Sequence, residues 1–562
     1  MGSRVLRPPT RATWRSTARF PFLLIWIPNG TVISAFRKAN MLRMNPTLRC
    51  GSVLSLLSLL FVWSSLYGCA PLPAAEKRAP LPADVQASYA WLNRVTWGAT
   101  TSAAQQLAQL GQRQWLQQQL QASNSDLPEP ARTTVHAMTV SQTGLTDLVL
   151  KMEQQRKDAD SVKDDAGKKL AQQAYQAEMS RLAREAATRH LLRALYSPAQ
   201  VQEQMTWFWL NHFNVHSAKH NLRAMVGDYE ESALRPNALG HFRDLLGAVA
   251  YHPAMLRYLD NEQNADGRIN ENFARELMEL HTLGVDGGYS QSDVQELAKV
   301  LTGVGVNLGT SNPTIRKGLS HWYVRRGLFE FNPQRHAMGT KTLLGHHVSG
   351  GGLPEVDAAL DILAGHPATA RFVSRKLATF WLSDTPPPAL IDRMVSTWKV
   401  TDGHIAKVLE TLFTAPEFMN APPAKFKDPM RYVVSSVRLA YDEKVVLNVG
   451  PMLNWINRMG EPLYGRQTPD GYPLVASGWD SAGQLNTRFE IAKAIGSGSA
   501  GLFKTEGPQP TEKAAFPQLA NALYFQSIQA TLSAATRAAL EQASTPQEWN
   551  TFLLAAPEWM QR

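Results

Sequence analysis

Residues 145–195 read LTDLVLKMEQQRKDADSVKDDAGKKLAQQAYQAEMSRLAREAATRHLLRAL. This stretch has no proline and no run of β-branched residues, and it is rich in Ala, Lys, Gln, Glu and Arg. These residue types lose little conformational freedom in a helix, so the stretch predicts one or two long helices. The dense charges between Lys151 and Asp165 predict that the segment is exposed, either as a solvated helix face or as a mobile hairpin.

Helical patterns also dominate the rest of the chain. Asp84 is suited to cap a helix that carries Tyr89 and Leu92 on one face, and Gln-rich helical sequence follows at 103–122. Further amphipathic helices are predicted at 371–381, 390–398, 404–413 and 430–441. Strand signals are few and short, and the best lies at 321–329. The sequence therefore predicts a mainly α protein: a large multi-helix globular body with irregular loops and at most a few short strands.

A short apolar run near the N-terminus predicts export. Residues 53–62 (VLSLLSLLFV) follow Arg43 and Arg49 and precede Leu66-Tyr67-Gly68-Cys69. Positive charge, a short apolar core and a small residue before a cysteine are typical of a bacterial lipoprotein signal, in which Cys69 would be lipidated. The alternative is a single membrane-spanning anchor, for which the run is short. We expect an outer-membrane lipoprotein that faces the periplasm or the cell surface, because Ala70 and not Asp follows the cysteine.

These features divide the chain into a leader, a tether and a body. Residues 1–68 form the expected leader, and 1–40 are interpreted as an over-extended start because Met41 and Met44 follow them. Residues 69–83 are rich in Pro and Ala, a composition suited to a flexible tether. Residues 84–562 are the expected helical body, long enough for one large core or two smaller ones.

The basic character of the chain belongs to the leader. The whole chain has 57 Lys and Arg against 47 Asp and Glu, but nine of these bases and no acid fall within residues 1–68. The remainder therefore holds 48 bases against 47 acids. A nearly neutral body indicates no phosphate-binding surface, so we expect no nucleic-acid partner. The partner that the sequence does predict is the membrane, through lipidated Cys69, and no protein partner is indicated.

The cysteines restrict the chemistry of the mature protein. Cys50 and Cys69 are the two cysteines of the chain, and the first lies in the expected leader while the second would carry lipid. The mature protein would then have no disulfide, no haem attachment motif, no iron–sulfur motif and no cysteine nucleophile.

Three histidines at a spacing of four follow an aromatic stretch. On a continuous helix His212, His216 and His220 would lie on one face and could hold zinc or another divalent ion. The asparagines in this stretch favour a helix end near Phe213, which would separate the histidines. His212 is therefore either a ligand or catalytic group, or a hydrogen-bonded histidine of the core.

Residues 270–284 (NENFARELMELHTLG) are the strongest local pattern in the chain. At about 100° per residue, Glu276 and Glu279 fall on one face of a helix. Phe273, Leu277 and Leu280 fall on the opposite face, with His281 nearer to it. A glycine at position 284 is suited to end the helix.

The glutamates of this helix permit two interpretations. Glu276 and Glu279 with nearby His281 could form a general acid/base pair or a carboxylate-rich metal site. Arg275 and Glu279 have instead the spacing of an ordinary ion pair on a helix surface. The pattern leaves a functional polar cluster and a buried structural network equally open.

Six motifs occur in order along the chain: 92–100 (LNRVTWGAT), 209–213 (WLNHF), 235–243 (RPNALGHFR), 252–261 (HPAMLRYLDN), 270–281 and 289–294 (YSQSDV). With 366–372 (HPATARF) and 469–473 (PDGYP), they resemble the bacterial family catalogued as domain of unknown function 1800. The resemblance covers nearly all of the expected mature chain. It implies an exported protein and no established reaction.

One motif departs from the family pattern. The family's His-Asp-x-Gly-x-Lys corresponds here to His336-Ala-Met-Gly-Thr-Lys341, so Ala337 replaces the acid. If that acid is a ligand or base in relatives, this chain lacks it, while His336 and Lys341 remain.

Two hypotheses of function follow from the sequence. The first is a periplasmic enzyme, metal-assisted in one form, whose candidate residues gather around one cleft: His212, Glu276, Glu279, His281 and His336. The second is a non-catalytic envelope scaffold or binding lipoprotein whose polar motifs are buried networks. Hydrolysis by a Ser/His/Asp arrangement ranks below both, because the sequence has no G-x-S-x-G motif.

Overall fold

Helices carry most of the chain in the computed structural model, which describes residues 85–121, 126–442, 444–446, 448–504 and 516–562. The regions predicted as leader, lipidation site (Cys69), tether and Asp84 cap lie outside these residues. The described residues belong to one compact unit. The mainly α prediction is confirmed, and the strands of the described part form two small sheets.

The first three helices lie close to the positions predicted for them, and two short helices that were not predicted follow. They are α1 (Val85–Val95), α2 (Thr101–Leu110), α3 (Gln112–Gln119), α4 (Glu129–Ala137) and α5 (Thr139–Gln142). The Gln-rich stretch predicted as helical is two helices, because Gly111 takes a φ of +73° between α2 and α3. Glycine adopts this left-handed region without the steric cost that a side chain would bring.

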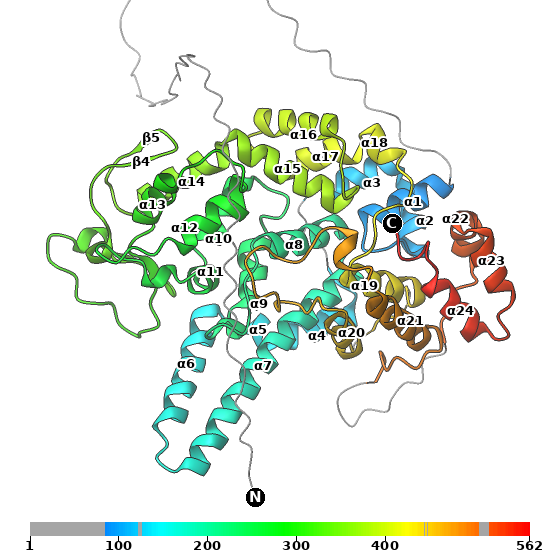
Figure 1. The fold of residues 1–562 in the computed structure, drawn as a ribbon. Coiled ribbons are helices and arrows are strands. Elements are labelled where there is room, and N and C mark those ends of the chain that lie inside the picture. The colour runs from blue at the N-terminus through cyan, green and yellow to red at the C-terminus, as the bar shows by residue number, and fades with distance from the viewer. Residues whose placement is uncertain (1–84, 122–125, 443, 447, 505–515) are drawn as a thin grey trace, which may run out of the picture. The chain divides into compact units, whose positions relative to one another are not determined.

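The segment 145–195 forms a helical hairpin of α6 (Leu145–Ser161) and α7 (Asp165–Tyr196), which lie side by side (Figure 1). Asp164 caps α7 by accepting a hydrogen bond from the Gly167 amide. The prediction of full exposure is wrong for the second half of α7, where most residues from Ala186 to Leu195 are buried. Tertiary packing of this end overrides the polar composition of the whole segment.

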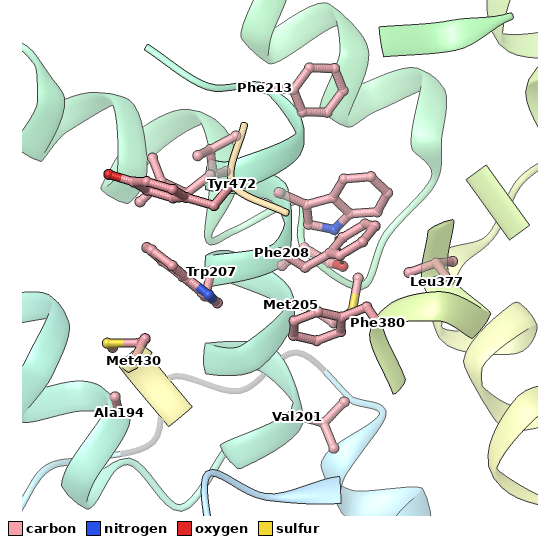
Figure 2. Packing of buried hydrophobic residues seen from close by; sticks show 14 of the residues in the cluster. Ala194, Val201, Met205, Trp207, Phe208, Phe213, Leu377, Phe380, Met430 and Tyr472 are labelled. Carbon is pink, nitrogen blue, oxygen red and sulfur yellow. Dashed lines mark hydrogen bonds between the residues drawn. The ribbon is translucent and has the colours of Figure 1, made fainter. Parts of the chain in front are cut away.

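The core surrounds α8 (Gln200–His212), in which every residue except Asn211 is buried. Figure 2 shows Phe208 beside Phe380, with a distance of 5.2 Å between the ring centroids. Trp207 stacks on Tyr472 at 6.5 Å. A helix that is buried on all sides needs apolar or hydrogen-bonded residues around its whole circumference, which explains why α8 is not amphipathic.

Short helices connect α8 to the next long elements. They are η1 (Leu222–Ala224), α9 (Val226–Asp228), the π-helical η2 (Tyr229–Leu234), α10 (Phe242–Ala250), α11 (Pro253–Tyr258), η3 (Asn261–Gln263), α12 (Asn272–Glu276), the π-helical η4 (Leu277–Thr282) and α13 (Gln291–Val300). The candidate site is built on α12 and η4.

The strand signal at 321–329 corresponds to a hairpin. Strands β2 (Val324–Arg326) and β3 (Phe329–Phe331) pair antiparallel, and β1 (Val304–Val306) adds to the other edge of β3, so that the order is β1-β3-β2. Strands β4 (Lys341–Leu343) and β5 (His346–Val348) form the second antiparallel pair. The short helices η5 (Ser320–Trp322) and η6 (Pro333–Arg335) flank this region.

The C-terminal part is helical again, and six of its described helices begin at a proline. The helices of this part are α14 (Pro354–Gly365), α15 (Pro367–Trp381), α16 (Pro388–Val400), α17 (Ile405–Phe413), α18 (Pro416–Met419), α19 (Pro429–Ala440), α20 (Gly450–Arg458), η7 (Ala476–Gly478), α21 (Ala482–Gly496), η8 (Tyr524–Ile528), α22 (Gln529–Thr531), α23 (Ala534–Glu541) and α24 (Pro546–Ala555). Proline suits the first turn, where its missing N–H would have no helical partner. None of the helices among the described residues combines the length and the apolar character that crossing a membrane requires.

Candidate functional site

The helix over residues 272–282 changes from α to π after Glu276, at the centre of the predicted site. Its buried residues form two rows at intervals of four: Phe273, Leu277 and His281, and Ala274, Met278 and Thr282. A π turn contains more residues than an α turn, so His281 replaces Leu280 on the buried face. The Thr282 hydroxyl donates to the Leu277 carbonyl at 2.7 Å and supports this turn. The predicted placement of Leu280 on the apolar face is therefore wrong, and that of His281 is right.

The π turn brings His281 against His212. Helix α8 ends at His212, and Nε2 of His212 donates to the carbonyl oxygen of His281 at 3.0 Å. The two imidazole rings lie 6.0 Å apart between centroids. Nδ1 of His212 and both ring nitrogens of His281 are buried without a hydrogen-bond partner among the described residues. Two histidines from distant motifs thus meet in the interior with three free ring nitrogens.

Burial keeps both imidazoles neutral. It lowers the pKa of His281 to about 3 and that of His212 well below its usual range, and the nearby Lys376 lowers both pKa values further. Lys376 lies on α15 with its Nζ 5.4 Å from the Phe372 ring centroid. Burial lowers the pKa of this lysine to about 8, an effect that Asp470 opposes.

A glycine lets α15 approach the turn. Gly284 follows η4 with a φ of +83°, and a Cβ placed there would lie 2.7 Å from Cδ2 of Phe372. The predicted role of Gly284 at the end of this helix agrees with that left-handed backbone. Gly284 also allows the segment of α15 that carries Phe372 and Lys376 to lie close to His281.

The loop 466–472 is fastened to the end of α8 by two asparagines. Asn211 donates to the Tyr472 carbonyl at 3.0 Å, and Asn214 donates to the carbonyls of Arg466 and Thr468 at 3.0 and 2.9 Å. Gly471 has a φ of +77°, and a Cβ there would lie only 2.2 Å from the Asn211 carbonyl oxygen. The backbone of the loop therefore reaches α8 at a distance that only glycine permits.

This loop carries Asp470, whose charge acts on Glu276. Burial and the carboxylate of Glu279 raise the pKa of half-buried Glu276, and Asp470 adds to the repulsion. Partial burial also acts to raise the pKa of Asp470, but hydrogen bonds from Thr468 and Arg466 outweigh it and hold that pKa below its usual range. The pKa values of these two carboxyl groups are thus shifted in opposite directions.

The ion pair predicted between Arg275 and Glu279 does not form, because Arg275 has another partner. Arg275 pairs with Glu271 at 2.9 Å, so the expected ion pair between Arg275 and Glu279 is wrong. Glu279 is partly buried and raises the pKa of Tyr289, a residue whose own partial burial is the larger cause. Its carboxylate therefore remains beside Glu276 on the polar side of the helix.

The three-histidine site predicted as one alternative does not form. His212 ends α8, and His220 takes a φ of +50°, so the histidines do not follow one helix face. His220 lies instead 3.8 Å from a carboxylate oxygen of Asp260. Among the described residues, no group of three or more His, Cys, Asp or Glu side chains is placed to hold a metal ion.

His336 belongs to another network. Its Nε2 lies 3.1 Å from Glu355 and 3.2 Å from Nζ of Lys341, and its Nδ1 donates to the Thr302 carbonyl at 2.8 Å. Lys341 also forms a salt bridge with Glu355 at 2.5 Å, and all three side chains are buried. The five predicted site residues therefore do not share one hydrogen-bonded network. Ala337, at the position of the family's acid, donates its amide to the Thr302 hydroxyl.

Comparison with known proteins agrees with the motifs. A family model described as "Protein of unknown function (DUF1800)" matches residues 90–561. The chain belongs to the DUF1800 family. No curated protein and no solved structure matches the chain.

Several motifs of this DUF1800 protein meet at the π turn. Asn211 and His212 come from 209–213, Glu276 and His281 from 270–281, and Asp470 from 469–473. Sequence analysis missed Asp470 although the motif that contains it was evident. Lys376 had no local signal, because a lysine on an amphipathic helix is usually a solvent-facing residue.

Proposed function

We propose that this DUF1800 protein is an acid–base enzyme with Glu276 and Asp470 as its catalytic carboxyl groups. The observation that carries the proposal is that the charge of Asp470 acts on Glu276, while Asn211 and Asn214 fix the loop 466–472, which carries Asp470, to α8. The environments of the two groups raise the pKa of Glu276 and lower that of Asp470 from their usual values. Perturbed carboxyl groups of this kind are concentrated at catalytic sites.

Hydrolysis is the reaction that suits such a pair. Glu276 would donate its proton to the oxygen of the leaving group as the bond to carbon breaks. Asp470 would accept a proton from water as the water oxygen bonds to that carbon, so that the products gain the elements of one water molecule. Two carboxyl groups with opposed pKa shifts are the usual means of cleaving glycosidic bonds, and a glycan is therefore the proposed substrate class.

The remaining residues of the site would position these two groups. Burial keeps His212 and His281 neutral, and the positive charge of Lys376 adds to this effect. The hydrogen bond from His212 to the His281 carbonyl holds the π turn against α8. The site uses side chains of this chain for every step, and no step is assigned to a metal.

The test is a comparison of variants on chromogenic aryl glycosides and on envelope polysaccharides. Glu276→Gln and Asp470→Asn in the full chain should each lower kcat at least about 100-fold, the loss typical of a general acid or base. Their melting temperatures should stay within a few degrees of the wild type. Glu271→Gln is the matched control, because Glu271 lies one turn before Glu276 and pairs with Arg275.

Two results would contradict the proposal. Undiminished hydrolysis by Glu276→Gln would remove its catalytic role. A loss of stability in both variants, with no hydrolysis of any glycan by the wild type, would support the alternative of a non-catalytic envelope scaffold.

We also propose that the protein is an exported lipoprotein anchored through Cys69. The support is the sequence of the leader, with its arginines, its short apolar run and Gly68 before the cysteine. Cys69→Ser should abolish labelling by a radioactive fatty acid, while Cys50→Ser, in the segment that would be removed, should not. Unlabelled wild-type protein found in the cytoplasm would refute the assignment.

A further inference from the structure

Five cationic side chains that take no part in the proposed catalytic site meet in the interior. They are Arg94 of α1, Lys427, Arg431 of α19, Arg488 of α21 and Arg562, and each is at most 3% exposed. They are close enough to repel one another: Arg431, Arg488 and Arg562 all act on Lys427, and Arg94 acts on Arg562. Buried charges in proteins are normally paired, so this group needs an explanation.

Backbone carbonyls and aromatic rings hold these cations. Arg431 donates to the Thr96 carbonyl at 3.0 Å, and Arg562 donates to the Arg94 carbonyl at 3.2 Å. Nζ of Lys427 lies 3.7 Å from the Trp559 ring centroid. These contacts satisfy part of the hydrogen-bonding capacity, but carbonyls and rings bring no net negative charge.

The acidic groups nearby are too few to neutralise the five cations. Asp428 and Glu461 are the carboxyl groups that act on Arg431 and Arg488, and none of the five cations forms a salt bridge within the described residues. Glu461 accepts a hydrogen bond from the Met430 amide at 2.8 Å. Even with the terminal carboxylate of Arg562 included, five positive charges face three acidic groups.

Three hydrogen-bond donors of this group are free. The Nε–H groups of Arg431, Arg488 and Arg562 are buried without a partner among the described residues. An unpaired buried guanidinium N–H is costly, and three in one cationic cluster are difficult to explain by packing alone. Excess positive charge and free donors are the two requirements for binding an anion.

We propose that this cluster binds a small inorganic anion, chloride in solution. One monovalent anion would accept hydrogen bonds from the free Nε–H groups and reduce the excess charge that the three acidic groups leave. A cavity of about 200 Å³ lies on the other side of the Lys427 contact: Trp559, against which Lys427 packs, lines it together with Asn93 and Gln561. The last two residues are the chain neighbours of Arg94 and Arg562.

A bound anion in this position would join distant parts of the chain. The donors that it contacts come from α19, α21 and the C-terminal residue, so the anion acts as a structural ligand of the folded state. A ligand that binds only the folded state raises the melting temperature as its concentration increases. The alternative is that Lys427 loses its proton and no anion binds.

Thermal unfolding at constant ionic strength separates these two possibilities. Replacing gluconate by chloride up to 200 mM should raise the Tm of the full chain by about 2 °C, and bromide should act similarly. Lys427→Met should abolish most of this response, because it removes a charge from the cluster. Lys425→Met is the matched control and should retain it, since Lys425 has its own carboxylate partner in Asp384.

A second measurement does not depend on the folding of a variant. Crystals of the wild type grown with bromide should show an anomalous peak within about 4 Å of the Nε atoms of Arg431, Arg488 or Arg562, the contact distance of a halide and an N–H donor. Equal Tm values in chloride and gluconate would overturn the proposal, as would the absence of bromide at these atoms, and a neutral Lys427 would then account for the cluster.

Discussion

Replacing Glu355 by Gln is expected to be among the most destabilising changes of a polar residue in this protein. The Glu355 carboxylate forms a salt bridge with Lys341, lies 3.1 Å from Nε2 of His336, and accepts the amides of Gly351 and Gly352 at 2.8 and 3.0 Å. Its side chain is 0% exposed and that of Lys341 is 3% exposed. Glutamine keeps the shape but leaves the ammonium of Lys341 in the interior without its counter-charge.

The magnitude follows from this burial. Removing one partner of a buried ion pair costs about 3–5 kcal/mol, whereas an exposed pair contributes about 0–1 kcal/mol. We therefore expect Glu355→Gln to lower the free energy of unfolding by about 4 kcal/mol. Asp392→Asn should lower it by less than about 1 kcal/mol. Asp392 and its partner Arg371 are 57% and 50% exposed, which makes this pair the surface control.

Urea denaturation followed by circular dichroism measures both free energies. A double variant, Lys341→Met with Glu355→Gln, should recover a large part of the loss, because no unpaired charge remains buried. If Glu355→Gln costs no more than Asp392→Asn, or if the double variant is less stable than Glu355→Gln alone, the reasoning from burial is refuted.

Three further predictions concern the loop, the histidines and the charge. Gly471→Ala should lower the Tm through its positive φ and its contact with Asn211, while Gly483→Ala, with no atom near its Cβ in α21, should not. Because burial depresses the pKa values of His212 and His281, the free energy of unfolding is highest above about pH 6.5. At lower pH it falls, by about 1.4 kcal/mol per histidine at pH 5.5. His281→Gln should thus reduce the Tm difference between pH 7.5 and 5.5, and an unchanged difference would contradict these pKa directions. Protein lacking residues 1–68 should not bind DNA at physiological salt, and micromolar salt-sensitive binding would disprove the charge argument.

The sequence predicted helices more accurately than it predicted their environment. The amphipathic pattern at 404–413 corresponds to α17, Ile405–Phe413, because one apolar stripe of a single helix faces the core. The same α-helical periodicity placed Leu280 on the buried face of its helix, because it did not predict the π turn. A π turn has no strong local signal, since packing of His281 against His212 and Phe213 selects it.

The candidate site was predictable only in part. Glu276 and His281 stood out because carboxylates and a histidine occur together on one short helix. Asp470 and Lys376 lie about 100 to 190 residues farther along the chain, and no periodicity relates them to that helix. His336 appeared equally functional in the sequence, yet it is part of the buried network with Lys341 and Glu355.

By itself, the sequence determined the helical class of this protein, the positions of most helices and its membership of the family, because these depend on neighbours within about one or two helical turns or on motif order. The export signal stays a prediction from the sequence, because it lies outside the described residues. Only the tertiary structure decided which polar residues meet. The position of the loop that carries Asp470 depends on Asn211 and Gly471. The five buried cations are spread along the sequence between residues 94 and 562. Burial and pairing are properties of three-dimensional packing, and they determine whether a charged side chain is solvated, structural or poised for chemistry.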